Sequence, residues 1–269
     1  MLAAMVRLDE PLRPADFPTV PYEDATPLLA DLAALRRHAG ETGYLFLPGL
    51  LPDEVVGPVR AFVRDYCLRQ GWLLPDEGNP PQVRVRAGAR LTGRGWDDAR
   101  FVELQRELRL CAPFQALGQC RAVLDILSAL AGQEVWMATA NYCWVKLPGS
   151  PAQTTRPHQD RFYLPACPSL WTGWVPLADI PLEVGPLGVV PRSHHRDWPH
   201  IDAQTGIDVP ADTTWATGPV RAGDVLLFDT GTVHCGWSNM SETLVRLCLD
   251  IRYEARPGAG EVTPLRPLG

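Results

Sequence analysis

Apolar residues in the first half of the chain recur at helical spacing. Leu28, Leu32 and Leu35, for example, stand three or four residues apart and would share one face of a helix. The helices predicted in this way span residues 27–38, 53–69, 99–109 and 121–131. A short strand is expected between the first two helices, over residues 43–49.

The pattern changes near residue 134, where short runs rich in β-branched and aromatic residues alternate with Gly/Pro turns. The predicted strands span residues 134–147, 157–163, 171–178, 187–191, 225–229, 233–237 and 244–254. Short strands at this spacing are typical of an antiparallel sandwich or barrel. We therefore expect a mainly β fold whose core, residues 134–254, is buttressed by the helices.

We expect residues 1–269 to form a single domain, with residues 1–133 as a mostly helical buttress, because single β domains often reach this length. Residues 75–97 are rich in Gly, Pro and Arg and are interpreted as a long loop or a lid. The formal net charge of −6 argues against nucleic-acid and anionic-membrane partners. Seven scattered cysteines and an N-terminus without a signal peptide favour the cytoplasm.

The first candidate for chemistry is Pro157-His158-Gln159-Asp160. If this segment is a strand, His158 and Asp160 point to the same face, because side chains alternate along a strand. An imidazole and a carboxylate are two ligands of the 2-His-1-carboxylate facial triad of non-haem iron(II). The pair is short enough to occur by chance in an ordinary surface strand.

His234 follows a Gly-Asp turn, an apolar strand and a polar loop within residues 221–239. It is a candidate third ligand or, alternatively, a structural histidine at the start of a strand. Arg246 lies on the strand face opposite Leu247 and Leu249. An arginine that points into a barrel needs an anion, and a carboxylate fits its planar fork. An ion pair with Asp250 or Asp229 would satisfy it equally.

Together, HQD, GPLGVVPRSH, GDVLLFDTGTVH and Arg246 resemble the phytanoyl-CoA dioxygenase family of iron(II)/2-oxoglutarate oxygenases. The resemblance covers roughly residues 134–254, and GYLFLPGLLPDEVV is similar to the family's opening. It implies a double-stranded β-helix (jelly-roll, cupin-like) core. The chain departs from the family pattern in two places: Gly236 replaces a Ser or Thr two residues after the distal histidine, and Arg192 replaces a glycine before Ser-His.

The resemblance also implies the site and its cofactors. Iron(II) would be held by His158, Asp160 and His234, and 2-oxoglutarate would be anchored by Arg246. O₂ would be the second co-substrate. Trp174 and Asn141 are assigned to the co-substrate pocket by the same resemblance.

A small organic molecule is the expected substrate. The candidates for an aromatic wall around it are Tyr142, Tyr163, Trp171 and Trp237, although tryptophans are more often core residues. The carboxylate at Asp160 fills a position that is small in related halogenases, which favours hydroxylation with release of succinate and CO₂. Desaturation, cyclisation or epimerisation at the same iron centre stays open, as does a non-catalytic, cupin-like metal-binding protein.

Overall fold

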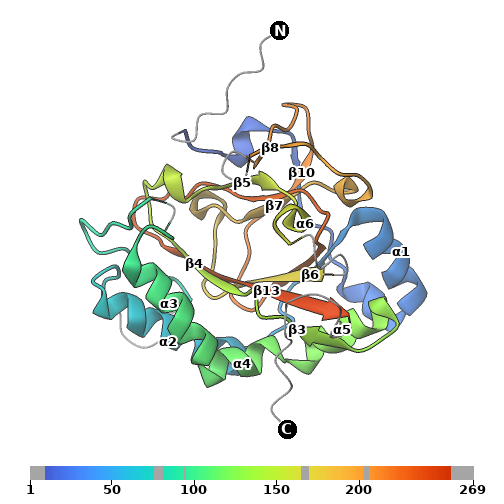
Figure 1. Cartoon of the computed structure of the whole chain (residues 1–269), viewed down its shortest axis with the longest axis horizontal. Helices are drawn as coiled ribbons and strands as arrows, with labels where there is room; N and C mark the ends of the chain where they lie inside the picture. The colour runs from blue at the N-terminus through green and yellow to red at the C-terminus, as the bar shows by residue number, and fades with distance from the viewer. Residues whose placement is uncertain (1–9, 76–80, 94, 165–169, 203–205, 256–269) are drawn as a thin grey trace.

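The strands form two main sheets in the computed structural model, which describes residues 10–75, 81–93, 95–164, 170–202 and 206–255 (Figure 1). One sheet has the strand order β1-β10-β7-β12-β5. Its strands are β1 (Thr19–Val20), β10 (Trp215–Ala216), β7 (Leu187–Val189), β12 (His234–Gly236) and β5 (Thr155–His158).

The second sheet has the order β2-β11-β6-β13-β3, and β4 also pairs with β13. Its strands are β2 (Tyr44–Leu47), β11 (Val225–Asp229), β6 (Leu170–Pro176), β13 (Arg246–Ala255), β3 (Val135–Met137) and β4 (Tyr142–Lys146). From β5 onward the chain passes repeatedly from one sheet to the other. This alternation is the double-stranded β-helix, so the predicted fold class is confirmed. A separate two-stranded ribbon joins β8 (His200–Asp202) to β9 (Gly206–Ile207).

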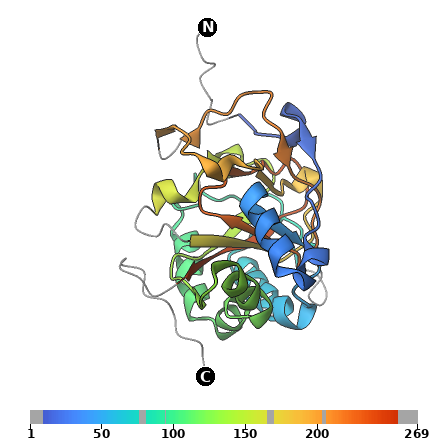
Figure 2. The same ribbon diagram turned by 90° about the vertical axis from the view of Figure 1, so that its right-hand side faces the viewer.

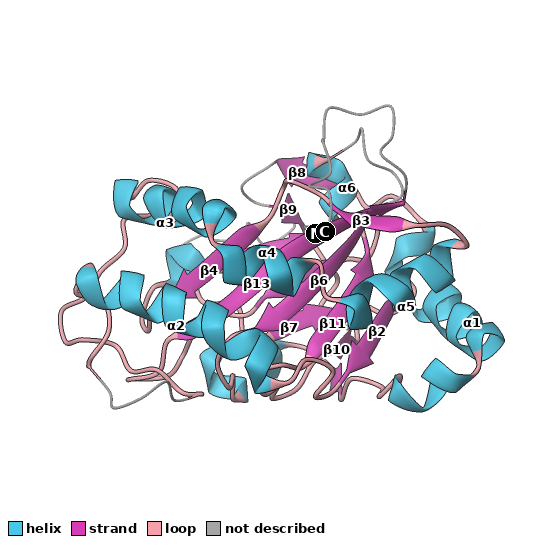
Figure 3. Ribbon diagram, turned by 90° about the horizontal axis from the view of Figure 1, so that it is seen from below, coloured by secondary structure: helices cyan, strands magenta, loops and turns pink. Residues whose placement is uncertain are grey.

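Helices cover the outer face of the second sheet (Figure 3). They are α1 (Leu32–Thr42), α2 (Asp53–Arg69), α3 (Ala99–Leu110), α4 (Ala112–Gly118) and α5 (Arg121–Ala131). A side view shows the helical layer below the strands (Figure 2). The largest apolar core lies between this layer and the sheet, as expected for amphipathic helices that bury one face. None of the described helices is long and apolar enough to cross a membrane.

Strand β13 connects the core with the cavity between the two sheets. Leu247, Leu249 and Ile251 are fully buried in the core beneath the helices. Arg246 and Arg252 point to the opposite face and line the cavity. The alternation read from the sequence is therefore present in the structure.

Some observed elements differ from the predicted ones; the strand predicted over 134–147, for example, is divided into β3 and β4. The segment predicted as one helix over 27–38 is a 3₁₀ turn, Thr26–Ala30, followed by α1, whose N-cap Asp31 accepts hydrogen bonds from two backbone amides. Helix α4 was not predicted. The strand predicted over 157–163 is wrong beyond His158, because the chain there turns into a single helical turn, α6 (Asp160–Tyr163).

Candidate metal centre and cavity

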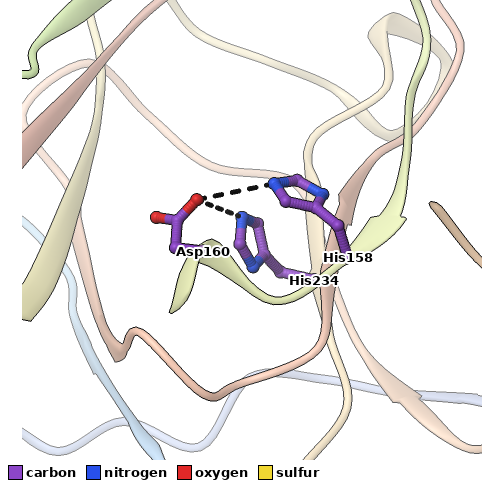
Figure 4. Close-up of side chains that lie close together, drawn as sticks. All are labelled: His158, Asp160 and His234. Carbon is purple, nitrogen blue, oxygen red and sulfur yellow. Dashed lines mark ion pairs between the residues drawn. The ribbon is translucent and has the colours of Figure 1, made fainter. Parts of the chain in front are cut away.

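Three potential metal ligands converge between the sheets: His158 at the end of β5, Asp160 at the start of α6, and His234 at the start of β12 (Figure 4). One ligand atom from each lies within 4.8 Å of the others. Oδ1 of Asp160 is 3.5 Å from Nε2 of His158 and 3.8 Å from Nε2 of His234. The two histidines are directly paired across β5 and β12, which explains why residues far apart in the sequence meet here.

Backbone carbonyls set the orientation of both imidazoles. Nδ1 of His158 is 2.8 Å from the carbonyl oxygen of Arg156, and Nδ1 of His234 is 3.0 Å from that of Thr232. A carbonyl can only accept, so each Nδ1 carries a proton and each Nε2 is the ring nitrogen that faces the cluster. Burial and the neighbouring His158 lower the pKa of His234 to about 3, which keeps this imidazole neutral.

Asp160 reaches the cluster from a helical turn instead of from the strand face that the sequence suggested. The turn is closed by a hydrogen bond from the Leu164 amide to the Asp160 carbonyl. The carboxylate accepts a hydrogen bond of 2.6 Å from the Thr172 hydroxyl. It also accepts hydrogen bonds of 3.0 and 3.1 Å from Nη2 of Arg252. Burial acts to raise the pKa of Asp160, but Arg252 and the histidines hold it well below its usual value.

This donor set fits iron(II). Two imidazoles and one carboxylate on one side of a common point form a facial triad, which leaves coordination positions for other ligands. All three residues are buried, and no other described His, Cys, Asp or Glu joins the cluster. Each ligand also has a hydrogen-bond partner that fixes its orientation, as is usual for metal ligands.

A cavity of about 340 Å³ opens beside the triad. Aromatic side chains line one part of it: Trp96 contacts Tyr142 and Trp144 edge to face, with ring centroids 5.2 and 6.1 Å away. Tyr163 lines another part and packs edge to face on His158 at 5.5 Å. The predicted lid, residues 75–97, lies partly outside the described residues, but Trp96 within it contributes to the cavity.

Arg246 also lines this cavity. Its Nη1 donates to the Gly185 carbonyl at 2.7 Å, and its guanidinium lies 5.4 Å from the centre of the Trp174 ring. Neither of the alternative ion pairs, with Asp250 or Asp229, forms. Lys146 approaches the same region, because a Cβ at Gly236 would lie 2.8 Å from both the Lys146 Nζ and the Arg246 Nη1.

Other residues assigned from the sequence are placed differently. Trp171 packs into the core beneath the helices, since its neighbour Thr172 takes the inner face of β6. Trp237 is fully buried in a third apolar cluster and donates to the Thr217 hydroxyl, so neither tryptophan lines the cavity. Asn141 is committed to backbone partners: it accepts from the Arg252 amide and donates to the Ala138 carbonyl. The structure therefore gives no support to Trp171 and Trp237 as parts of a substrate wall or to Asn141 as a co-substrate contact.

Sequence reasoning missed Arg252, Thr172 and Lys146. Arg252 shares the inner face of β13 with Arg246, six residues away, so alternation alone could have assigned it to the cavity. Lys146 is the only lysine in the chain, yet it is 2% exposed, which is rare for an unpaired lysine. Thr172 gave no distinguishing signal.

The family model described as Phytanoyl-CoA dioxygenase (PhyH) matches residues 40–248. A 1-deoxypentalenic acid 11-beta-hydroxylase from Streptomyces arenae is 26% identical over 265 residues, covering 90% of this chain and 89% of that protein.

Solved structures share the fold. The epimerase SnoN, solved in complex with Fe³⁺, alpha ketoglutarate and nogalamycin RO, is 23% identical, with a TM-score of 0.58 over 89% of this chain and 96% of that one. AviO1 from Streptomyces viridochromogenes Tue57 is 21% identical, with a TM-score of 0.56 over 86% and 98%.

Proposed function

The chain belongs to the phytanoyl-CoA dioxygenase family and is an iron- and 2-oxoglutarate-dependent oxygenase; from that premise we propose that it hydroxylates an unactivated C–H bond of a small organic molecule. His158, Asp160 and His234 would hold iron(II), and Arg246 would bind the distal carboxylate of 2-oxoglutarate. Iron bound there supplies oxidation by O₂, coupled to conversion of 2-oxoglutarate to succinate and CO₂.

One observation carries the proposal: a buried facial triad and a buried arginine without an acidic partner line the same cavity. A buried guanidinium is stable only beside an anion. The triad and Arg246 therefore provide the two attachment points that a metal-chelating dicarboxylate needs. A binding protein that only held a metal ion would have no use for Arg246 in this position.

The remaining wall is suited to an organic substrate. Trp96, Tyr142 and Trp144 offer an aromatic surface that lines the same cavity as the triad. The relatives named for 1-deoxypentalenic acid act on a small organic acid. We therefore propose a natural-product intermediate as substrate. We also propose that the enzyme acts in the cytoplasm without a nucleic-acid partner, in keeping with the net charge of −6.

Other outcomes use the same centre. Two neighbours are described as an epimerase and a carbocyclase, so the product depends on which substrate hydrogen lies nearest the iron. Mass analysis of the product distinguishes them: hydroxylation adds one oxygen atom, cyclisation or desaturation removes two hydrogens, and epimerisation leaves the mass unchanged.

The test is an anaerobic titration of the purified protein with iron(II) and then 2-oxoglutarate, followed by the visible charge-transfer band of the chelate. The wild type should show the band. Asp160→Ala should lose it with the metal, whereas Arg246→Met should still bind iron and require much more 2-oxoglutarate. A folded wild type that binds iron but gives no band would contradict the proposal and favour a cupin-like metal-binding protein.

A further inference from the structure

Two buried basic side chains meet beside the cavity. Lys146 on β4 and Arg246 on β13 are direct cross-strand partners, 2% and 1% exposed. No carboxylate forms an ion pair with either of them among the described residues. Two adjacent basic groups without a counterion are unfavourable in a protein interior as long as both are charged, so this arrangement favours the binding of an anion that the chain does not itself supply.

Gly236 provides the space for both cations. It lies on β12, two residues after His234, and a Cβ there would come within 2.8 Å of both charged groups. Any larger residue at this position would displace Lys146 or Arg246. The glycine therefore leaves this position without a hydroxyl group that could bind the anion.

A hydroxyl is available directly across the sheet. Thr155 on β5 is the cross-strand partner of Gly236, and it lines the cavity. Nζ of Lys146 donates a hydrogen bond of 2.8 Å to the Thr155 hydroxyl oxygen, reaching from one sheet to the other. Because that oxygen accepts from Lys146, its own O–H is directed elsewhere, and none of the described residues accepts it.

We propose that Thr155 donates a hydrogen bond to the distal carboxylate of 2-oxoglutarate beside Arg246, and that Lys146 is the positioning residue that orients and polarises the Thr155 hydroxyl. This inference rests on the function proposed above. The three side chains come from three strands, β4, β5 and β13: the Arg246 guanidinium and the Thr155 hydroxyl face the carboxylate, and Lys146 donates to Thr155 from behind.

The arrangement has a cost in the absence of the co-substrate. Burial and the nearby Arg246 hold the pKa of Lys146 well below its usual value. Replacing Lys146 with methionine, which has a similar length and no charge, removes this unfavourable burial. The ligand-free Lys146→Met variant should therefore unfold at a higher temperature than the wild type while binding 2-oxoglutarate more weakly.

The test uses purified protein with iron(II) under anaerobic conditions and two ligands, 2-oxoglutarate and 2-oxovalerate. The second has the same carbon chain but lacks the distal carboxylate. Thr155→Val and Lys146→Met should each lower the affinity for 2-oxoglutarate about 10- to 100-fold, the effect of losing a hydrogen bond to a charged group. Both variants should bind 2-oxovalerate with an affinity within about two-fold of the wild type, since this ligand has no distal carboxylate for Thr155 to contact. Thr155→Ser retains the hydroxyl and should retain wild-type affinity.

Unchanged affinity of Thr155→Val or Lys146→Met for 2-oxoglutarate would overturn the inference and leave the proposed function intact. An equal loss of affinity for 2-oxoglutarate and 2-oxovalerate would also overturn it, because that pattern indicates a structural defect. A wild type that binds iron but neither ligand would instead remove the proposed function, and this inference with it. Thermal unfolding of the ligand-free variants gives a readout that does not depend on turnover.

Discussion

Arg252 holds the carboxylate of Asp160 by one nitrogen, with its Nη2 3.0 Å from Oδ2 and 3.1 Å from Oδ1. The remaining side of the carboxylate is turned toward the two histidines. The central strand β13 thus contributes to both ends of the cavity: Arg252 orients a candidate metal ligand, and Arg246 offers a site for an anion.

Replacing Arg252 should weaken iron binding. Arg252→Met removes the charge that keeps Asp160 ionised and oriented, and losing such a partner of a metal ligand typically lowers metal affinity about 10- to 100-fold. Competition with a chromogenic chelator under anaerobic conditions measures this. Arg252→Lys, which keeps the charge on a shorter side chain with a single nitrogen, should lie between Arg252→Met and the wild type. Wild-type iron affinity in Arg252→Met would show that Asp160 does not depend on Arg252.

Adding a methyl group at Gly236 should impair co-substrate binding more than folding. The groups that a Cβ would meet are the mobile ends of Lys146 and Arg246, which can move aside at low cost. We expect Gly236→Ala to lower the affinity for 2-oxoglutarate about tenfold or more, which is the effect of displacing a hydrogen bond to a charged group. Gly40→Ala is the matched control, since nothing lies within 4 Å of its added Cβ. Equal affinities of the two variants, measured by calorimetry, would contradict the expectation.

Binding of 2-oxoglutarate should take up a proton at Lys146. Burial, followed by Arg246, depresses the pKa of this lysine, while Cys248, Asp250 and Cys235 act in the opposite direction. A carboxylate bound nearby raises the pKa again. Between the ligand-free and ligand-bound pKa values the complex binds more protons, so affinity falls as the pH rises through that window. Calorimetry in two buffers of different ionisation enthalpy measures the uptake, which Lys146→Met should abolish.

Trp237 should prove to be a stability residue. Its indole donates to Thr217 at 3.0 Å and packs against Phe17 and Trp215, away from the cavity. Trp237→Phe loses this hydrogen bond and some packing, which should lower the free energy of unfolding by about 1–3 kcal/mol. Urea unfolding gives the stability change. The affinity for 2-oxoglutarate should stay at the wild-type value, and a large decrease in it would restore Trp237 to the site.

The sequence could predict those features that depend on residue type and strand alternation. The alternation within 244–254 correctly separated Leu247 and Leu249 from Arg246. The HQD pattern identified His158 and Asp160, which the structure brings together with His234. The same alternation assumption gave the wrong local structure for Asp160, because the turn after His158 depends on tertiary hydrogen bonds from the Gln159 side chain to the carbonyls of Arg196 and Gly231.

Side-chain partners across the two sheets could not be predicted in this way. Whether a tryptophan on a strand faces the cavity or the helices depends on register, and a shift of one residue reverses it. Trp171 and Trp174 stand three positions apart, so alternation places them on opposite faces, but it does not tell which of the two lies beneath the helices. The position of Lys146 could not be predicted either, since it depends on pairing with Arg246, a hundred positions later, and on the space left at Gly236.

The position of β5 gives the metal centre a mechanical role. Among the described residues this strand ends its sheet, paired with β12, and it carries His158 at its last position. An ion shared by His158 and His234 would cross-link the edge strand to its neighbour and close a long loop of the chain. Local opening of β5 would then require dissociation of the ion, so hydrogen exchange along this edge reports occupancy of the site without any turnover.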